Sequence, residues 1–236
     1  AVANQSTPTE TPVLDVNFAL ANKGATSFTA TSGQVVTINS TAIANPAAIR
    51  AATDGVLVNT PTFVVDNPPN YSDYSLTFDG VNEYGTMSVA ALDATFTASA
   101  WVNYPAGKTS GYDYIISFGD TSAARKHFSM SRNAADDIVY CFDGTVLMGT
   151  TALPTDEWVH VAMVVKPTTD RLTLYINGIE DTIAQPVGDF DIDASTGAIG
   201  RWQAGASIYN AGSIDEVAIW NSALTSAQIN DIYNGG

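Results

Sequence analysis

The chain has 236 residues, of which 45% are hydrophobic and 14% are charged, and its formal net charge is −15. This many apolar side chains can form a sizeable core, which excludes a charge-rich disordered chain. The excess of acidic groups repels phosphate backbones and anionic lipid headgroups, so we expect neither nucleic-acid binding nor membrane-surface binding. No apolar run approaches the roughly 18–20 residues of a membrane-spanning helix, so membrane insertion is not expected.

Residues 1–11 are rich in Ser, Thr and Pro and have no hydrophobic periodicity, so we predict a flexible leader or an attachment arm. From Pro12 onward, short runs of β-branched and aromatic residues alternate with turn residues, which is typical of an all-β fold. The predicted strands cover residues 12–18, 27–31, 34–38, 55–65, 74–78, 83–89, 95–103, 114–118, 127–131, 138–142, 158–165, 171–176 and 213–220. Residues 12–236 are therefore predicted to form a single domain, with an irregular insertion around residues 40–70.

Two local features are well specified. In residues 171–176, apolar side chains alternate and lead into Asn177-Gly178, the dipeptide that best accepts positive φ at both positions of a type I′ turn. This pattern predicts a β-hairpin. Residues 224–233 form the one helical pattern, because Thr225 and Gln228 are spaced as a capping box at its start. We therefore predict an all-β domain with one short C-terminal helix.

Five blocks, in order, resemble the laminin-G-like, concanavalin A-like jelly-roll family. They are YSLTFDGVNEY at residues 74–84, FTASAWV at 96–102, WVHVAMV at 158–164, LTLYING at 172–178 and GSIDEVAIWNSAL at 212–224. The resemblance places the first strand of the family at residues 13–18. It implies a two-sheet antiparallel jelly-roll sandwich.

The same resemblance implies a structural Ca²⁺, because many members hold one beside the strand that carries Ile-Asp-Glu-Val. The Asp215 side chain and the Gly80 carbonyl would then bind the ion, with Asp79 or Asp15 nearby. The alternative is that Asp215 caps a turn or pairs with a basic side chain. His127 and His160 have no Cys or His at metal-ligand spacing, so no zinc site is expected.

Relatives on this fold include glycoside hydrolases and lyases, which raises the question of catalysis. A retaining glycosidase needs two carboxyl groups roughly 5–5.5 Å apart. The chain has no Glu-x-Asp-x-x-Glu or similar motif, and its nearest acidic cluster is the DFDID run at residues 189–193. Alternation in that run predicts exposed carboxylates and buried apolar side chains. We therefore expect a protein that is not an enzyme.

Aromatic residues in the predicted loops form the candidate ligand-binding site. Three flank the loop at residues 105–111, and two flank residues 203–207. Such rings on a rigid scaffold stack on sugars or anchor a protein partner, whereas the alternative is ordinary loop solvation. The candidate residues are Tyr104, Tyr112, Tyr114, Trp202, Gln203 and Tyr209.

These features predict a non-catalytic recognition or adhesion module at the surface of a larger assembly, such as a virus particle or a cell-surface fibre. Its expected partners are other subunits of that assembly, a neutral polysaccharide, or both, and its expected location is extracellular or on a virion. The alternative is a secreted carbohydrate-binding domain of a polysaccharide-degrading system, or a degenerate hydrolase or lyase. A fold of this kind supports unrelated functions, so the function has to be inferred from the residues of the site.

Overall fold

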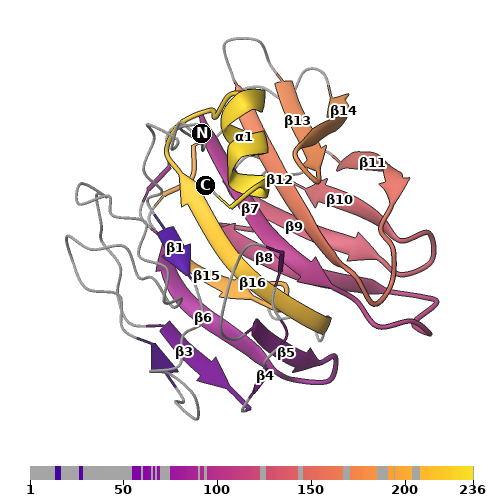
Figure 1. Cartoon of the computed structure of the whole chain (residues 1–236). Coiled ribbons are helices and arrows are strands. Elements are labelled where there is room, and N and C mark those ends of the chain that lie inside the picture. Colours follow the sequence, from indigo (N-terminus) through magenta and orange to yellow (C-terminus); the bar gives the residue numbers. More distant parts are fainter. Residues whose placement is uncertain are drawn as a thin grey trace, which may run out of the picture.

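Two antiparallel β-sheets and one helix make up the described part of the chain (Figure 1). The computed structural model describes residues 14–16, 27–28, 55–59, 61–64, 66, 68–69, 75–89, 91–92, 95–122, 126–142, 146–166, 171–184, 191–193, 195–203 and 208–235. The predicted leader, the strand predicted at residues 34–38 and most of the insertion predicted around residues 40–70 lie outside this set. The sandwich predicted from sequence is confirmed.

The first sheet, sheet A, follows the strand order β14-β13-β12-β7-β16-β5-β4, and β1 also pairs with β16. Its strands are β1 (Leu14–Val16), β4 (Thr62–Val64), β5 (Ser75–Asp79), β7 (Phe96–Asn103), β12 (Trp158–Lys166), β13 (Arg171–Ile176), β14 (Ile179–Ala184) and β16 (Ala211–Trp220). The β13–β14 turn has φ values of 49° at Asn177 and 76° at Gly178, which confirms the predicted hairpin.

The second sheet, sheet B, follows the order β11-β10-β9-β8-β15-β6-β3-β2. Its strands are β2 (Ser27–Phe28), β3 (Gly55–Val58), β6 (Tyr84–Val89), β8 (Tyr112–Gly119), β9 (His127–Asn133), β10 (Ile138–Phe142), β11 (Val146–Ala152) and β15 (Ser195–Ile199). β11 and β14, at the ends of the two sheets, meet where Thr150 N–H donates to Asp181 Oδ2 at 2.7 Å.

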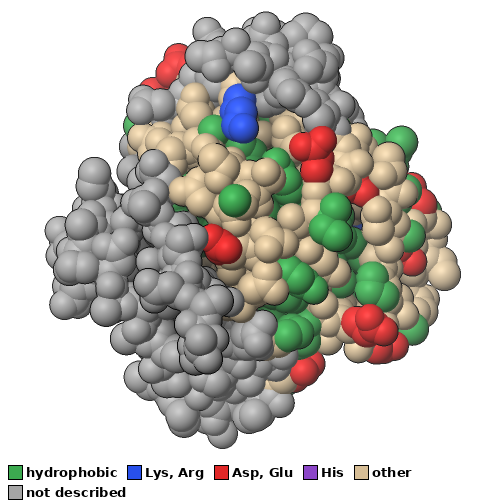
Figure 2. Space-filling view, turned by 45° about the horizontal axis from the view of Figure 1, so that its top comes forward, with side chains coloured by type: hydrophobic (Ala, Val, Ile, Leu, Met, Phe, Trp, Pro, Cys, Tyr) green, Lys and Arg blue, Asp and Glu red, His purple; other side chains and the backbone are tan. Residues whose placement is uncertain are grey.

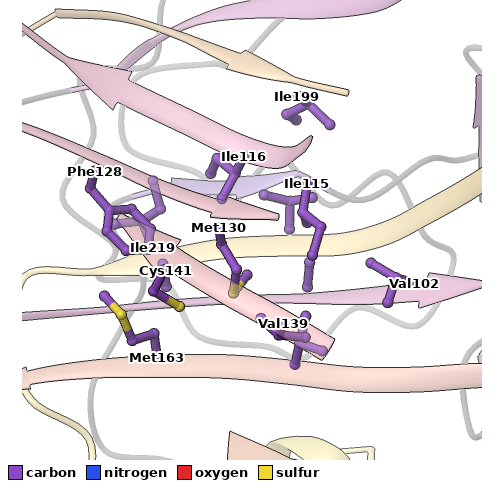
Figure 3. Close-up of a cluster of buried hydrophobic side chains, with 14 of the residues drawn as sticks. Val102, Ile115, Ile116, Phe128, Met130, Val139, Cys141, Met163, Ile199 and Ile219 are labelled. Atoms are coloured by element: carbon purple, nitrogen blue, oxygen red, sulfur yellow. The ribbon is translucent and has the colours of Figure 1, made fainter. Parts of the chain in front are cut away.

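The core lies between the inner faces of the two sheets (Figure 3). Sheet A contributes Val102 and Met163, and sheet B contributes Ile116 and Phe128, each at most 1% exposed. Cys141 is also fully buried there, where its side chain packs among the apolar groups. Alternation along each strand directs the remaining side chains outward, so each sheet also has an outer face.

The run at residues 55–65 was predicted as one strand, but it forms two strands in different sheets. β3 belongs to sheet B and β4 to sheet A. Asn59 between them has a φ of 61°, and Pro61 has no N–H for a sheet ladder. The prediction also missed β11 and β15, and it gave no bounds for β14, the second strand of the predicted hairpin; these small, polar or Gly-containing segments lack a strong apolar alternation.

The helix α1 (Ser226–Tyr233) packs on the outer face of sheet A (Figure 1). Thr225 and Gln228 form the predicted capping box. Ile229 is fully buried against Ala162 and Trp220 of the sheet. α1 therefore covers much of the face that sheet A would otherwise present to water.

Candidate functional site

A line of aromatic side chains crosses the outer face of sheet B. We call Tyr140, Tyr112, Tyr114 and Trp202 the aromatic strip. The ring centroids of Tyr140 and Tyr112 are 5.7 Å apart, those of Tyr112 and Tyr114 are 6.4 Å apart, and those of Tyr114 and Trp202 are 5.5 Å apart. The last pair is stacked, with 23° between the ring planes. The structure thus brings three of the predicted residues together and adds Tyr140.

Strand register explains why these rings share one face. Tyr114 and Tyr140 both pair with Ser131 of β9, one from each side. Residues directly opposite each other in a sheet project to the same side. Ser131 is only 4% exposed, so a small side chain lies between two large rings. The sequence showed Tyr140 beside Cys141, but its place in the strip depends on this long-range pairing.

The strip is partly accessible. Tyr112 is 39% exposed, while Tyr140 and Trp202 are half-buried. Tyr114 lies deepest at 7%, and burial raises the pKa of its hydroxyl to about 12, with a smaller contribution from Tyr112. Met148, which pairs with Tyr140, is 51% exposed and extends the apolar surface to β11. Tyr114 therefore lies beneath the accessible surface of the strip, and the neighbouring rings provide the area that a ligand can contact.

Tyr140 is held in place from the β9–β10 turn. Its Oη donates to Asp136 Oδ2 at 3.1 Å, and Asn133 Nδ2 donates to the same oxygen at 3.2 Å. The other oxygen, Asp136 Oδ1, accepts from the backbone N–H of Ile138 at 3.2 Å. These bonds fix one end of the aromatic strip before any ligand arrives.

Gln203 holds the other end of the strip instead of facing a ligand. Its backbone N–H donates to Ser117 Oγ at 2.7 Å, and its Nε2 donates to the Gly119 carbonyl. Its Oε1 is buried. The prediction that Gln203 contacts a ligand is therefore corrected: its amide anchors the segment that carries Trp202.

Tyr104 is not on the surface, which corrects its assignment to the ligand site. It is 1% exposed, and its Oη accepts a hydrogen bond from Asn210 Nδ2 at 3.2 Å. Burial, together with the charge of Asp113, raises the pKa of the Tyr104 hydroxyl. A Cβ at Gly212 would lie 2.7 Å from the Tyr104 ring, so glycine there makes room for it.

A buried charge network lies on the inner side of β8. Asp113 is fully buried, and its carboxylate accepts from Lys108 Nζ at 2.5 Å, from Arg132 at 3.3 Å and from the backbone N–H of Ala211 at 2.8 Å. Arg132 also pairs with Asp137 and stacks over the Tyr104 ring. The network joins the β7–β8 loop, β8, β9 and the start of β16, so it fixes the backbone from which the strip projects.

Tyr209 lies beyond the strip, in a second aromatic group. Its ring centroid is 6.1 Å from that of Tyr84 in β6, and its backbone forms a β-bridge with Arg201. The Arg201 guanidinium lies over the same Tyr84 ring, 3.9 Å from the centroid. Tyr84 was not identified as a site residue in the sequence, because nothing in the local pattern pairs β6 with residues beyond β15.

The structure does not bring together the residues expected around calcium. Asp79 pairs with Ala211 and Asp215 pairs with Trp101, so the two aspartates are offset by four residues along β16, or about 13 Å. Within the described residues, no group of three or more His, Cys, Asp and Glu side chains could hold a metal ion. The described residues therefore do not bring Asp79 and Asp215 together as one ligand set. Calcium binding by the chain stays a prediction, which melting curves with and without EDTA would test.

Each of those aspartates has a local role. Asp79 Oδ1 accepts from the backbone N–H groups of Val81 at 2.8 Å and Asn82 at 3.2 Å, in the turn where Gly80 has a φ of 75°. Burial acts to raise the pKa of Asp79, but these hydrogen bonds outweigh it and lower the pKa. Asp215 Oδ1 accepts from the N–H of Glu216 at 2.9 Å, as in the alternative role of turn capping.

The acidic run at residues 189–193 is confirmed as surface over its described part. Ile192 is 1% exposed and forms a bridge with Leu92. The side chains of Asp191 and Asp193 are 75% and 83% exposed and lie near Lys126. This arrangement matches the predicted alternation of exposed carboxylates and buried apolar side chains.

The chain belongs to the concanavalin A-like lectin/glucanases superfamily, whose sequence profile matches residues 78–230. This confirms the resemblance found in the sequence. A search of curated protein sequences found no match. No helix among the described residues is long and apolar enough to cross a membrane.

Similar solved structures agree with the fold. Domain 4 of an extracellular GH43 arabinanase from Geobacillus stearothermophilus, solved with arabinotriose, has a TM-score of 0.55 and 19% identity, covering 77% of this chain and 88% of that one. A pentraxin from Limulus polyphemus gives 0.52 and 18%, covering 66% and 79%. The binding domain of botulinum neurotoxin serotype G gives 0.59 and 12%, covering 78% and 46%.

Proposed function

We propose that this chain is a non-catalytic recognition module that binds a glycan through the aromatic strip. The observation that carries the proposal is the continuous series of ring contacts from Trp202 to Tyr140, with Tyr112 39% exposed in the middle. The apolar faces of sugar rings stack on aromatic rings, and such side chains combine a large contact area with a fixed geometry. A strip of several rings suits a ligand with several sugar units.

The direction of the strip indicates how a glycan chain would lie across sheet B. The strip crosses from β8 over β9 to β10, and Met148 extends it to β11. Neighbouring strands are about 4.8 Å apart, so the part of the apolar surface from β8 to β11 spans roughly 14 Å, and Trp202 extends it toward β15. A ring buried on one aromatic contributes roughly 1–3 kcal/mol, which gives millimolar single-site affinity and useful avidity in multiple copies.

The experiment measures binding of a polysaccharide panel to Tyr112→Ala and Trp202→Ala by affinity electrophoresis and calorimetry. Each variant is expected to bind severalfold more weakly than the wild type, with a nearly unchanged melting temperature. Val81→Ala is the matched control, because Val81 is 67% exposed and lies outside the strip. Wild-type binding by both aromatic variants would contradict the proposal, and unfolding of both would instead assign these rings to the core.

Absence of catalysis is part of the proposal. Three described carboxylates lie close to the strip in sequence and register, and all are engaged. Asp136 holds Tyr140, Asp113 is buried in its ion pairs, and Asp137 pairs with Arg132. A glycosidase needs an acid and a nucleophile or base facing the substrate. Release of reducing ends from β-glucans, agars or alginates by the purified chain would refute this part.

The proposed setting is extracellular, on the surface of a larger assembly such as a virus particle or a cell-surface fibre. The structural similarity to the arabinanase domain supports the alternative, a carbohydrate-binding domain in a secreted polysaccharide-degrading system. Cross-linking from residues 1–11, combined with light scattering, separates the two. An assembly component should cross-link to a second chain through this segment, whereas a carbohydrate-binding domain should remain a monomer.

A further inference from the structure

An arginine lies at the β15 end of the aromatic strip. Arg201 immediately precedes Trp202, and its backbone is fixed by a β-bridge to Tyr209. Its guanidinium carbon lies 3.9 Å from the centroid of the Tyr84 ring, and Tyr209 packs on that ring as well. The Arg201 side chain is half-buried. Its charged end is therefore held in a defined position next to the proposed glycan site.

Arg201 makes no ion pair with any residue that the structure describes. By contrast, Lys108, Lys126 and Arg132 each pair with an aspartate. The sequence contains 24 acidic residues and only 9 basic ones, so acidic partners are abundant. Stacking on Tyr84 uses the face of the guanidinium and leaves its in-plane N–H donors unused. Arg201 Nε is buried without a hydrogen-bond partner in this part of the chain.

We propose that Arg201 binds an anionic group, a carboxylate or a sulfate, on a sugar unit of the glycan that stacks on the aromatic strip. This inference rests on the proposed function and narrows its ligand to an acidic glycan. The planar guanidinium donates two parallel hydrogen bonds to such a group, which lysine cannot do. The acidic group would lie beside Tyr84, while neighbouring sugar rings stack on Trp202 and the rest of the strip.

The net charge of −15 acts against this ligand only at a distance. Figure 2 shows acidic side chains scattered over the visible surface among neutral ones. Such exposed charges are screened beyond about 8 Å at physiological ionic strength. Net charge alone favours a neutral glycan. At short range, however, contact with the unpaired Arg201 favours an acidic glycan.

The test uses matched ligands that differ only in charge. One pair is an oligogalacturonate and its methyl ester, and the other is a sulfated galactan oligosaccharide and its desulfated form. The wild type should bind the acidic member of at least one pair about tenfold more tightly than the neutral member. Arg201→Gln should abolish this preference yet still bind the neutral member, and the pair that responds identifies carboxylate or sulfate.

Lys166→Gln is the charge-matched control, because it removes one positive charge from sheet A, and it should keep the preference. Arg201→Lys retains the charge without the planar fork and should lose part of the preference, which provides a test even if Arg201→Gln fails to fold. Equal wild-type binding within both pairs, or an unchanged preference in the Arg201 variants, would overturn the inference. Binding to other glycans of the polysaccharide panel but to neither pair would overturn this inference alone, whereas failure to bind any glycan of the panel would overturn the proposed function itself.

Discussion

The outer faces of the two sheets both carry clustered aromatic rings, but only one cluster is covered. On sheet A, Trp101 stacks on Tyr233 of α1 at 5.5 Å and is 1% exposed. On sheet B, Tyr112 contacts Tyr114 and Tyr140 at similar distances and remains 39% exposed. Ring stacking alone therefore does not distinguish core from contact surface. The two faces differ because α1 covers the rings of sheet A, which makes them a second buried layer.

The two faces also differ in how they are held. The sheet A face depends on packing of α1. The segment that leads into α1 is fixed by Thr97, whose Oγ1 donates to the Ser222 carbonyl at 2.8 Å and accepts from the Leu224 N–H at 3.0 Å. Sheet B is supported from the inner side by the buried charges of Asp113 and Arg132. A contact surface can thus stay accessible because its support lies beneath the sheet.

The largest expected effect is on sheet A. Trp101→Ala should lower the free energy of unfolding by roughly 3–5 kcal/mol, because it leaves a cavity between sheet and helix. Tyr112→Ala on sheet B should cost less than about 1 kcal/mol, since that ring is partly exposed. Urea unfolding of both variants measures the contrast. Equal costs would show that the two faces do not differ as described.

The support beneath sheet B gives the next effect. Asp113→Asn should cost about 3 kcal/mol, because it leaves Arg132 and Lys108 without their buried partner. Asp191→Asn is the control, and it should cost less than about 1 kcal/mol since its ion pair is exposed. Urea unfolding of both variants compares them. A small loss in Asp113→Asn would mean that Asp137 alone satisfies Arg132.

His160 should make the sheet A face sensitive to acid. Burial lowers its pKa to about 3, and both ring nitrogens lack hydrogen-bond partners in the described structure. The unfolded chain, with an ordinary histidine pKa near 6.5, then binds more protons than the folded chain between these values. Stability is therefore full above about pH 6.5 and falls as the pH drops toward 3, by about 1 kcal/mol between pH 6 and pH 5.

Urea unfolding from pH 7 to pH 4 measures this dependence. His160→Gln should have a shallower pH dependence than the wild type, because it removes the titrating group. Parallel curves for the two proteins would assign the acid sensitivity to other groups.

The smallest effect separates two tyrosines that the sequence does not distinguish. Tyr140→Ala should weaken glycan binding roughly threefold to tenfold with little change in melting temperature, because it shortens the strip. Tyr104→Phe should leave binding unchanged but cost about 1 kcal/mol of stability, because it removes the acceptor for Asn210. Calorimetry and thermal unfolding of each variant give both quantities. The reverse result would place Tyr104 in the site and Tyr140 outside it.

Features that depend on neighbours along the chain could be predicted from the residues alone. Strand alternation, the Asn177-Gly178 turn and the capping box of Thr225 and Gln228 all use interactions within a few residues, and all were found as predicted. The ordered blocks from residue 74 onward also identified the family. Local patterns do not predict whether a side chain at the end of a strand points into the core or to the surface. Tyr104, just beyond the end of β7, is such a case.

Contacts between residues that are distant in the sequence became clear only in the folded chain. Tyr140 joins Tyr114 because both pair with Ser131, whereas the expected Asp79 and Asp215 are separated by the register of β5 and β16. Tyr104 is buried because Gly212, distant in sequence, leaves space for its ring. Pairing between distant strands sets these contacts, and no periodicity within one strand encodes it.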